Sequence, residues 1–161
     1  MTGALRKLQG FFIDRPPNYS EIDGKIAASG LPSRKKHMRY LKSRGVSAII
    51  SLTEQPLPKH LVDGFTYLHF PLKDHQPADA PTLMKIVEAV ETLLSRGHKT
   101  LIHCQAGHGR TGMVLTAFLM KHKGLGWREG LEFVRRLRPG SVEVGQEVSL
   151  RELEALLKPG S

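Results

Sequence analysis

The sequence contains a single cysteine, Cys104, among its 161 residues. One thiol cannot form an internal disulfide, so a disulfide-stapled secreted scaffold is excluded. The same count excludes a zinc site with two or more cysteine ligands and a redox relay that needs a resolving cysteine. The longest apolar run, Met113 to Met120, falls far short of the roughly 20 residues that cross a bilayer, and no secretory signal is visible near Met1. We therefore expect a cytoplasmic protein without a membrane span.

Acidic residues are also scarce, since 15 Asp and Glu face 24 Lys and Arg, giving a formal net charge of +9. Such a balance favours anionic partners: phosphorylated groups, nucleic acid or acidic membrane surfaces. No stripe of aromatic residues runs between the basic ones, as single-strand stacking platforms require, so we do not expect nucleic acid as the main partner. The length suits one domain over residues 1–161, with 1–15 as an N-terminal extension, and we expect a monomer.

Apolar periodicity and breaker residues predict alternating strands and helices. The chain opens with an irregular segment at 15–20, where two prolines exclude regular helix. Strands are expected at 46–52, 65–70 and 99–103, and helices at 33–41, 80–97, 110–123, 127–137 and 146–157. This alternation predicts an α/β domain with a central, mostly parallel sheet flanked by helices.

The stretch from His103 to Gly112 carries the most chemical information, because it joins a predicted strand to a predicted helix. Two glycines, Gly107 and Gly109, let the backbone curl so that successive amides point inward. The turn ends at a helix N-terminus, where unpaired donors and the helix dipole favour an anion. Arg110 adds a planar fork that can hold two phosphate oxygens. Cys104 begins the same ring, and the field that attracts phosphate also favours a thiolate, a nucleophile aimed at phosphorus.

Competing phosphate and metal sites lack their required residues. No Gly-Lys-Ser or Gly-Lys-Thr follows the glycines, as a nucleotide-binding P-loop needs. The histidines show no metal-ligand spacing, so we expect neither a metal nor another cofactor.

The pattern of cysteine, five residues and arginine, with His103 before it and Thr111-Gly112 after it, resembles the active-site signature of protein tyrosine phosphatases. Within that superfamily the chain is similar to the small atypical dual-specificity phosphatases and the compact archaeal protein tyrosine phosphatases. The resemblance covers roughly residues 16 to 155 and includes Pro-Pro-Asn-Tyr-Ser near the start, Phe-Pro-Leu-Lys-Asp at 70–74 and Arg-Pro-Gly-Ser at 138–141. It implies the protein tyrosine phosphatase-like fold, with the phosphate-binding loop between a strand and a helix.

The resemblance also implies roles for residues of the loop. Cys104 would be the nucleophile that forms a cysteinyl-phosphate, and Arg110 would bind the phosphate and stabilise the transition state. Thr111 would donate its hydroxyl to the sulfur in the second step, although it could instead serve only the first helical turn. His103 would anchor the loop through its ring. The remaining members would bind substrate mainly through backbone amides: Gln105, Ala106, Gly107, His108 and Gly109.

Two further roles are less tightly fixed by the pattern. The resemblance places the proton donor for the leaving oxygen on a loop upstream of the cysteine, and Asp74 lies 30 positions before Cys104. Asp79 is the rival, but it precedes Pro81 as a helix N-cap, and Asp63 is a third alternative. Gln146 is the candidate that positions the hydrolytic water, although the surrounding sequence is one residue out of step with the family pattern.

The predicted function is therefore a dual-specificity phosphatase that acts on phosphotyrosine and on phosphoserine or phosphothreonine in protein substrates. Phosphate, sulfate and vanadate would bind the same loop. The same catalytic set also serves relatives that act on phosphoinositides or RNA 5′-phosphates, which stay open as alternatives. A non-catalytic phosphate-binding module is a third alternative, but it predicts loss of the cysteine, the arginine or the acid, and all three are present.

Overall fold

A computed structural model describes residues 14–158, so the predicted N-terminal extension lies almost entirely outside the described residues. Five strands form one sheet in the order β1-β2-β5-β3-β4, with β1 antiparallel to β2 and the other neighbours parallel. The strands are β1 (Ser20–Glu21), β2 (Ile26–Ser29), β3 (Val46–Ser51), β4 (Thr66–His69) and β5 (Lys99–His103). This arrangement confirms the predicted α/β domain with a mostly parallel sheet.

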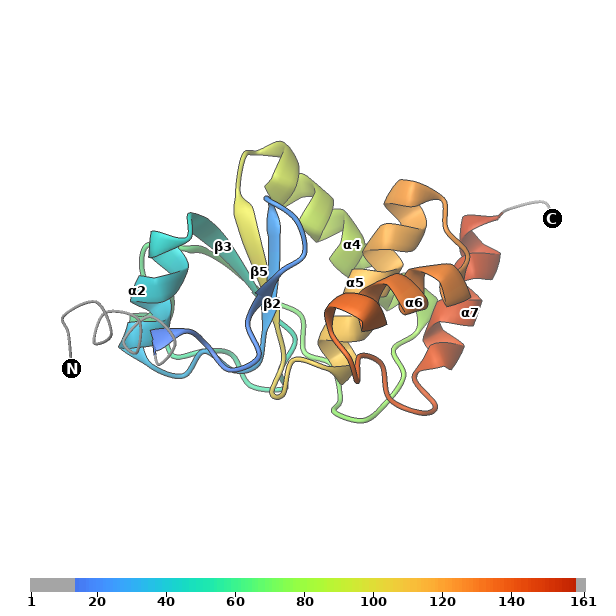
Figure 1. The fold of residues 1–161 in the computed structure, drawn as a ribbon, viewed down its shortest axis with the longest axis horizontal. Coiled ribbons are helices and arrows are strands. Elements are labelled where there is room, and N and C mark those ends of the chain that lie inside the picture. The colour runs from blue at the N-terminus through green and yellow to red at the C-terminus, as the bar shows by residue number, and fades with distance from the viewer. Residues whose placement is uncertain (1–13, 159–161) are drawn as a thin grey trace.

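Helices cover both faces of the sheet (Figure 1). They are α2 (Lys35–Ser43), α3 (Lys59–Val62), α4 (Ala80–Ser95), α5 (Gly109–Lys123), α6 (Trp127–Leu137) and α7 (Glu147–Leu157). Neighbouring strand residues point to opposite faces, as the strand period of two requires. Thus Ile49 and Leu101 pack with α2 and α3, whereas Ile50 and Ile102 pack with α4 to α7. The larger of the two cores lies on the α5 face.

The sequence did not predict β1, β2 or α3. The β2 segment Ile-Ala-Ala-Ser contains residues with little strand preference, yet all four are buried because β2 pairs with β5. The Asp23 carboxylate fixes its start by accepting the backbone N–H of Ile26 at 2.9 Å. Tertiary pairing, rather than local preference, therefore makes this strand.

The central strand and the central helix position the candidate site. β5 ends at His103, α5 begins at Gly109, and the five residues between them form a loop at the carboxyl edge of the sheet. Every residue of α5 from Gly109 to Met120 is buried, so this helix is held on all sides. The loop therefore lies between two rigid elements, as the sequence predicted.

Candidate active site

The carbonyl oxygens of the loop all face outward. Each one accepts a hydrogen bond from a group outside the ring of amides. The donors, in the order of the carbonyls of residues 104–108, are His103 Nδ1 at 3.2 Å, Leu31 N at 2.9 Å, Asn18 Nδ2 at 3.3 Å, Arg138 Nη2 at 2.7 Å, and both Gly112 N at 2.9 Å and Val142 N at 3.2 Å. In a trans peptide the N–H of the next residue points opposite to the carbonyl, and the described chain has no cis bond. The amides of residues 105–109 therefore point inward, as the sequence predicted.

The sulfur of Cys104 lies inside this ring. The side chain is buried, and its Sγ accepts the N–H of Gly107 at 3.3 Å. An amide donor of this kind stabilises a thiolate more than a thiol, because the negative sulfur is the stronger acceptor. The same donors would hold the equatorial oxygens of a phosphoryl group.

Two glycines of the loop allow close backbone packing. Gly107 has a φ of +85°, and a Cβ there would come within 2.8 Å of Ser29 and Gly30. A Cβ on Gly109 would lie 2.9 Å from Oε1 of Gln146. The unpredicted strand β2 thus supports the loop from behind, and a side chain at residue 107 would displace it.

Arg110 is positioned by the loop that follows β4. Its side chain is 4% exposed, and Nη1 donates to the carbonyl of Leu72 at 3.1 Å, while Nη2 lies 3.4 Å from Oδ1 of Asp74. Its buried Nε has no hydrogen-bond partner within residues 14–158. The guanidinium is therefore fixed at one end and keeps a donor for an anion.

The three candidate acids lie in different places. Asp74 contacts Arg110, and its carboxylate accepts the backbone N–H of His75 at 3.0 Å. Asp79 caps α4 by accepting the backbone N–H of Thr82 at 2.8 Å. Hydrogen bonds from the side chain and the backbone of Thr82 lower the pKa of Asp79. The Asp79 carboxylate is thus taken up by the cap of α4, whereas Asp74 contacts the guanidinium of the loop arginine. Asp63 follows α3, and its carbonyl accepts a hydrogen bond from Lys42 of α2. The geometry therefore favours Asp74, whose role stays a prediction.

A chain of hydrogen bonds orients His103 beneath the loop. The N–H of Leu57 donates to Tyr67 Oη at 2.9 Å, and Tyr67 donates to Ser51 Oγ at 2.8 Å, which in turn contacts His103 Nε2. Burial lowers the pKa of His103 to about 4, so the ring is neutral at pH 7. Because Nδ1 faces the carbonyl of Cys104, it carries the proton, and Nε2 accepts from Ser51. This ring thus occupies the anchoring place that the sequence indicated.

Thr111 and Gln146 lie beside the loop without the contacts that their expected roles need. Thr111 Oγ1 is buried and makes no hydrogen bond within residues 14–158. Gln146 is fully buried, its Oε1 accepts the N–H of Glu143 at 2.8 Å, and its Nε2 donates to the carbonyl of Gln76 at 3.2 Å. In this conformation Gln146 bridges two loops, and both catalytic roles stay predictions.

Sequence reasoning assigned no role to Arg138, which is 2% exposed. Besides the carbonyl of Gly107, it donates to the carbonyl of Asn18 at 2.8 Å and to Ser20 Oγ at 2.5 Å. Its guanidinium has no acidic partner within residues 14–158. Burial lowers the pKa of Arg138, and the charge of Cys104 offsets part of this shift. Both Arg138 and Asn18 belong to segments that carry the family resemblance. That resemblance is the one sequence feature that could have pointed to a role for them at the loop.

A second group that the sequence missed holds the loop of Asp74. His75 lies 2.8 Å from Oε2 of Glu143 through Nδ1 and 3.3 Å from Oδ2 of Asp74 through Nε2. His75 has a φ of 62°, an uncommon conformation for a residue with a side chain. The hydrogen bond to Glu143 and the charge of Asp74 raise the pKa of His75. No sequence signal joins positions 75 and 143, because they are 68 residues apart.

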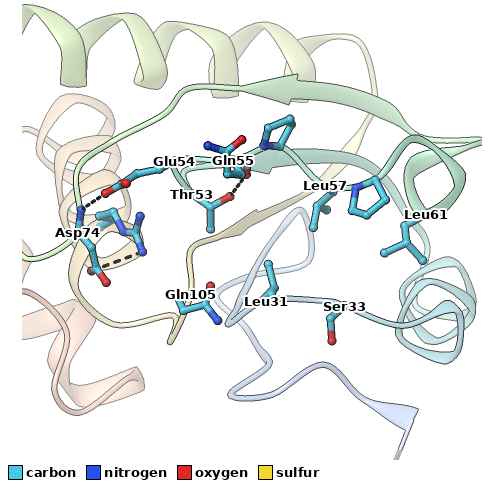
Figure 2. Close-up of a pocket in the computed structure, with 12 residues that line it drawn as sticks. Leu31, Ser33, Thr53, Glu54, Gln55, Leu57, Leu61, Asp74 and Gln105 are labelled. Carbon is cyan, nitrogen blue, oxygen red and sulfur yellow. Dashed lines mark hydrogen bonds and ion pairs between the residues drawn. The ribbon is translucent and has the colours of Figure 1, made fainter.

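A cavity of about 480 Å³ opens beside Arg110 and Asp74. Figure 2 shows its lining: Glu54 and Asp74 lie at one end, and Leu57 and Leu61 toward the other. Leu31, Pro56 and Pro58 complete an apolar wall, and Arg110 is the one Lys or Arg side chain in the lining. The site can therefore bind a phosphoryl group next to an apolar substituent.

Residues 14–158 contain no helix that is long and apolar enough to cross a membrane. They also contain no cluster of three or more His, Cys, Asp or Glu side chains arranged to hold a metal ion.

Comparison with known proteins places these features in a family. The model for the dual specificity phosphatase catalytic domain matches residues 31–155. The chain is 30% identical over 127 residues to a phosphatidylglycerophosphate phosphatase of Arabidopsis thaliana, which covers 75% of this chain. It is 32% identical over 105 residues to dual specificity protein phosphatase 15 of Homo sapiens, which covers 65%. The chain spans 55% and 35% of the lengths of these two relatives.

Solved structures share the fold. The crystal structure of Tk-PTP in its active form superposes with a TM-score of 0.78 at 36% identity, covering 86% of this chain and 97% of that one.

Proposed function

We propose that this chain, which belongs to the dual specificity phosphatase family, removes phosphate from phosphotyrosine and from phosphoserine or phosphothreonine in proteins. The inward-facing amides around Cys104 carry the proposal, because they form a site for a phosphoryl group centred on a nucleophilic sulfur. Arg110 supplies the cationic side of the same site. The chain is thus a cysteine-dependent phosphatase, and protein phosphoesters are the substrates proposed for it.

The first step transfers the phosphoryl group to sulfur. The Cys104 thiolate attacks phosphorus, an S–P bond forms, and the P–O bond to the substrate oxygen breaks. Asp74 gives its proton to that oxygen, so the product leaves as a neutral alcohol or phenol. Arg110 and the loop amides stabilise the charge on the equatorial oxygens in the transition state.

The second step releases inorganic phosphate. The Asp74 carboxylate takes a proton from water, the water oxygen attacks phosphorus, and the S–P bond breaks to return the Cys104 thiolate. In this step Thr111 would donate its hydroxyl to the departing sulfur. Gln146 would position the water, which requires its side-chain amide to exchange the bond to Gln76 for one to water.

The alternatives share this chemistry but differ in the group attached to phosphate. Phosphatidylglycerophosphate phosphatase among the relatives keeps a lipid substrate open. Lysines that could bind further phosphates of an inositol headgroup are absent from the loop, whose variable positions are 105–109. The apolar lining of the cavity likewise offers no second cation for an RNA 5′-triphosphate. A binding module without turnover is disfavoured because Cys104, Arg110 and Asp74 are all present.

Hydrolysis of p-nitrophenyl phosphate by the wild type and by Cys104→Ser tests the mechanism. We expect turnover by the wild type and none by the variant, with phosphate bound by both. Activity that survives in Cys104→Ser would overturn the nucleophile. A panel of phosphopeptides, phosphoinositides, phosphatidylglycerophosphate and triphosphorylated RNA then tests the substrate class. A higher kcat/KM for a lipid or an RNA than for every phosphopeptide would reject the protein substrate.

We also propose that the protein acts as a monomer in the cytoplasm, with phosphorylated proteins as partners. Phosphate, sulfate and vanadate should bind the Cys104 loop as competitive inhibitors, because each presents oxygens to the same amides. Sedimentation at two protein concentrations tests the monomer, and substrate-dependent inhibition by vanadate tests the anion site.

A further inference from the structure

A second groove adjoins the apolar cavity at Leu61, which lines both. The second groove has a volume of about 230 Å³. Lys35, Arg39 and Lys42 of α2 line it together with His60, and Asp63 is its one acidic side chain. A surface path therefore runs from the phosphate site past apolar side chains to a cluster of cations.

The cations of this groove have no structural task in the fold that would account for them. Lys35 and Arg39 are exposed and form no ion pair or side-chain hydrogen bond within residues 14–158. Among the described residues, Lys42 donates only to the carbonyl of Asp63, at 3.4 Å, and it lies over the Phe65 ring. No acidic residue of α2 offsets them, because the helix sequence is KKHMRYLKS. The result is a positive field at the end of the groove, where an anionic segment would be attracted.

The order of these surfaces indicates what binds along them. We propose that the physiological substrate is a phosphoprotein segment with acidic residues, which bind Lys35 and Arg39 while the phosphorylated residue occupies the Cys104 loop. An apolar residue between them packs against Leu57 and Leu61. This inference rests on the proposed protein phosphatase activity and adds its sequence preference.

A phospholipid would present these groups in a different order. In phosphatidylglycerophosphate one glycerol separates the phosphomonoester from the charged phosphodiester, and the acyl chains lie beyond both. Here the surface next to Arg110 is apolar and the cations come after it. A peptide satisfies this order, because each residue of an extended chain advances about 3.3 Å and can carry either an apolar or an acidic side chain.

The test compares three phosphotyrosine peptides of equal length. One carries three glutamates from the second residue after the phosphotyrosine, one carries them before it at the same spacing, and one has glutamines in their place. The variant is the double charge reversal Lys35→Glu with Arg39→Glu. The matched control, Lys85→Glu with Arg96→Glu, reverses two exposed cations of α4 and its C-terminal cap, on the opposite face of the sheet.

For the wild type we expect one of the two acidic peptides to have about 10-fold higher kcat/KM than the glutamine peptide. The gain should come from a lower KM, and it should shrink at high salt. The α2 variant should lose this preference while its rates with the glutamine peptide and p-nitrophenyl phosphate stay within about twofold of the wild type, as exposed charges outside the catalytic site predict. The α4 control should retain the preference.

Three outcomes would overturn the inference. The first is an equal kcat/KM of the wild type for all three peptides. The second is an equal loss of the acidic-peptide preference in the α2 and α4 variants. The third is an α2 variant that changes only the activity against anionic lipid vesicles containing a phosphomonoester lipid. Failure of the proposed function looks different, because then none of the peptides would be hydrolysed at a rate above that of the lipid or RNA substrates.

Discussion

Oδ1 of Asp74 lies 3.4 Å from Nη2 of Arg110, so the proposed proton donor contacts the phosphate-binding guanidinium directly. The Arg110 side chain is almost fully buried, whereas Asp74 is 44% exposed. An arriving phosphoryl group would compete with Asp74 for the guanidinium. The carboxyl group would then face the oxygen between phosphorus and the substrate, where a proton is needed.

Replacement of Asp74 by Asn should therefore slow the reaction according to the leaving group. We expect about a 100-fold loss in kcat with an alkyl phosphate, in the usual range for a general acid. A highly activated aryl phosphate needs no proton, so its first step should change far less. A series of aryl phosphates with graded leaving-group pKa measures the slope.

Asp79→Asn is the matched control for this series. Asp79 caps α4, so its loss should lower stability by at most about 1 kcal/mol and leave the leaving-group dependence of the wild type intact. A steeper leaving-group slope in Asp79→Asn than in Asp74→Asn would transfer the acid role to Asp79.

The ion pair between His75 and Glu143 should help to hold Asp74 in place. Glu143→Gln removes the charge but keeps a similar shape, and we expect kcat for poor leaving groups to fall about two- to threefold, the scale of an exposed pair. Activated aryl phosphates should be hydrolysed at the wild-type rate. A double-mutant cycle with His75→Asn measures the coupling, and purely additive effects of the two changes would show that the pair does not act as a unit.

The pH dependence of this pair follows from the raised pKa of His75. The charged form persists at higher pH than in an isolated histidine, so the pair is complete below about pH 6.5 and is lost as pH rises through the raised value. Nuclear magnetic resonance titration of the His75 ring should show its pKa fall in Glu143→Gln. An unchanged titration midpoint would contradict the assigned cause.

The loop from His103 to Gly112 could be predicted from the sequence because its function depends on local features. Glycines at 107 and 109, the Arg110 side chain and the helix start all lie within a few residues of Cys104, and the structure has the loop between β5 and α5. Asp79 as a helix cap was also readable, since an Asp two residues before Pro81 is a local signal.

The supports of the loop could not be predicted, because they come from distant segments. Asn18, Leu31, Arg138 and Val142 supply donors to the loop carbonyls, and nothing in their local sequence indicates which carbonyl each one meets. Strand β2 has no apolar alternation, yet it fills the space behind Gly107. Long-range packing decides these positions, and a single sequence does not encode it in a readable pattern.

Arg138 should be essential for the shape of the loop. Arg138→Met leaves the buried carbonyl of Gly107 and the partly buried carbonyl of Asn18 without their donor, and we expect a loss of about 2–4 kcal/mol in the free energy of unfolding. The matched control is Arg136→Met, at an exposed position with an i,i+4 pair to Glu132, where we expect a change below about 0.5 kcal/mol. Urea denaturation measures both, and equal stability of the two variants would reject the anchoring role.

His103 should make the protein sensitive to acid. In the unfolded chain its ring titrates near pH 6.5, whereas burial lowers the pKa in the folded protein to about 4. Between these values the unfolded state binds a proton that the native state does not, so stability is complete above pH 6.5 and declines as pH falls toward 4. This difference amounts to about 3 kcal/mol for the single group.

Urea unfolding of the wild type at pH 4.5 and pH 7 measures that loss, and His103→Gln should reduce the difference between the two conditions even if it lowers stability at both. The variant Ser51→Ala removes the hydroxyl at Nε2 but leaves the ring buried, so it should keep the acid sensitivity. A native His103 ring that titrates near pH 6.5, or a pH dependence unchanged in His103→Gln, would mean that burial does not keep the ring neutral. The acid sensitivity of the fold would then have to come from another group.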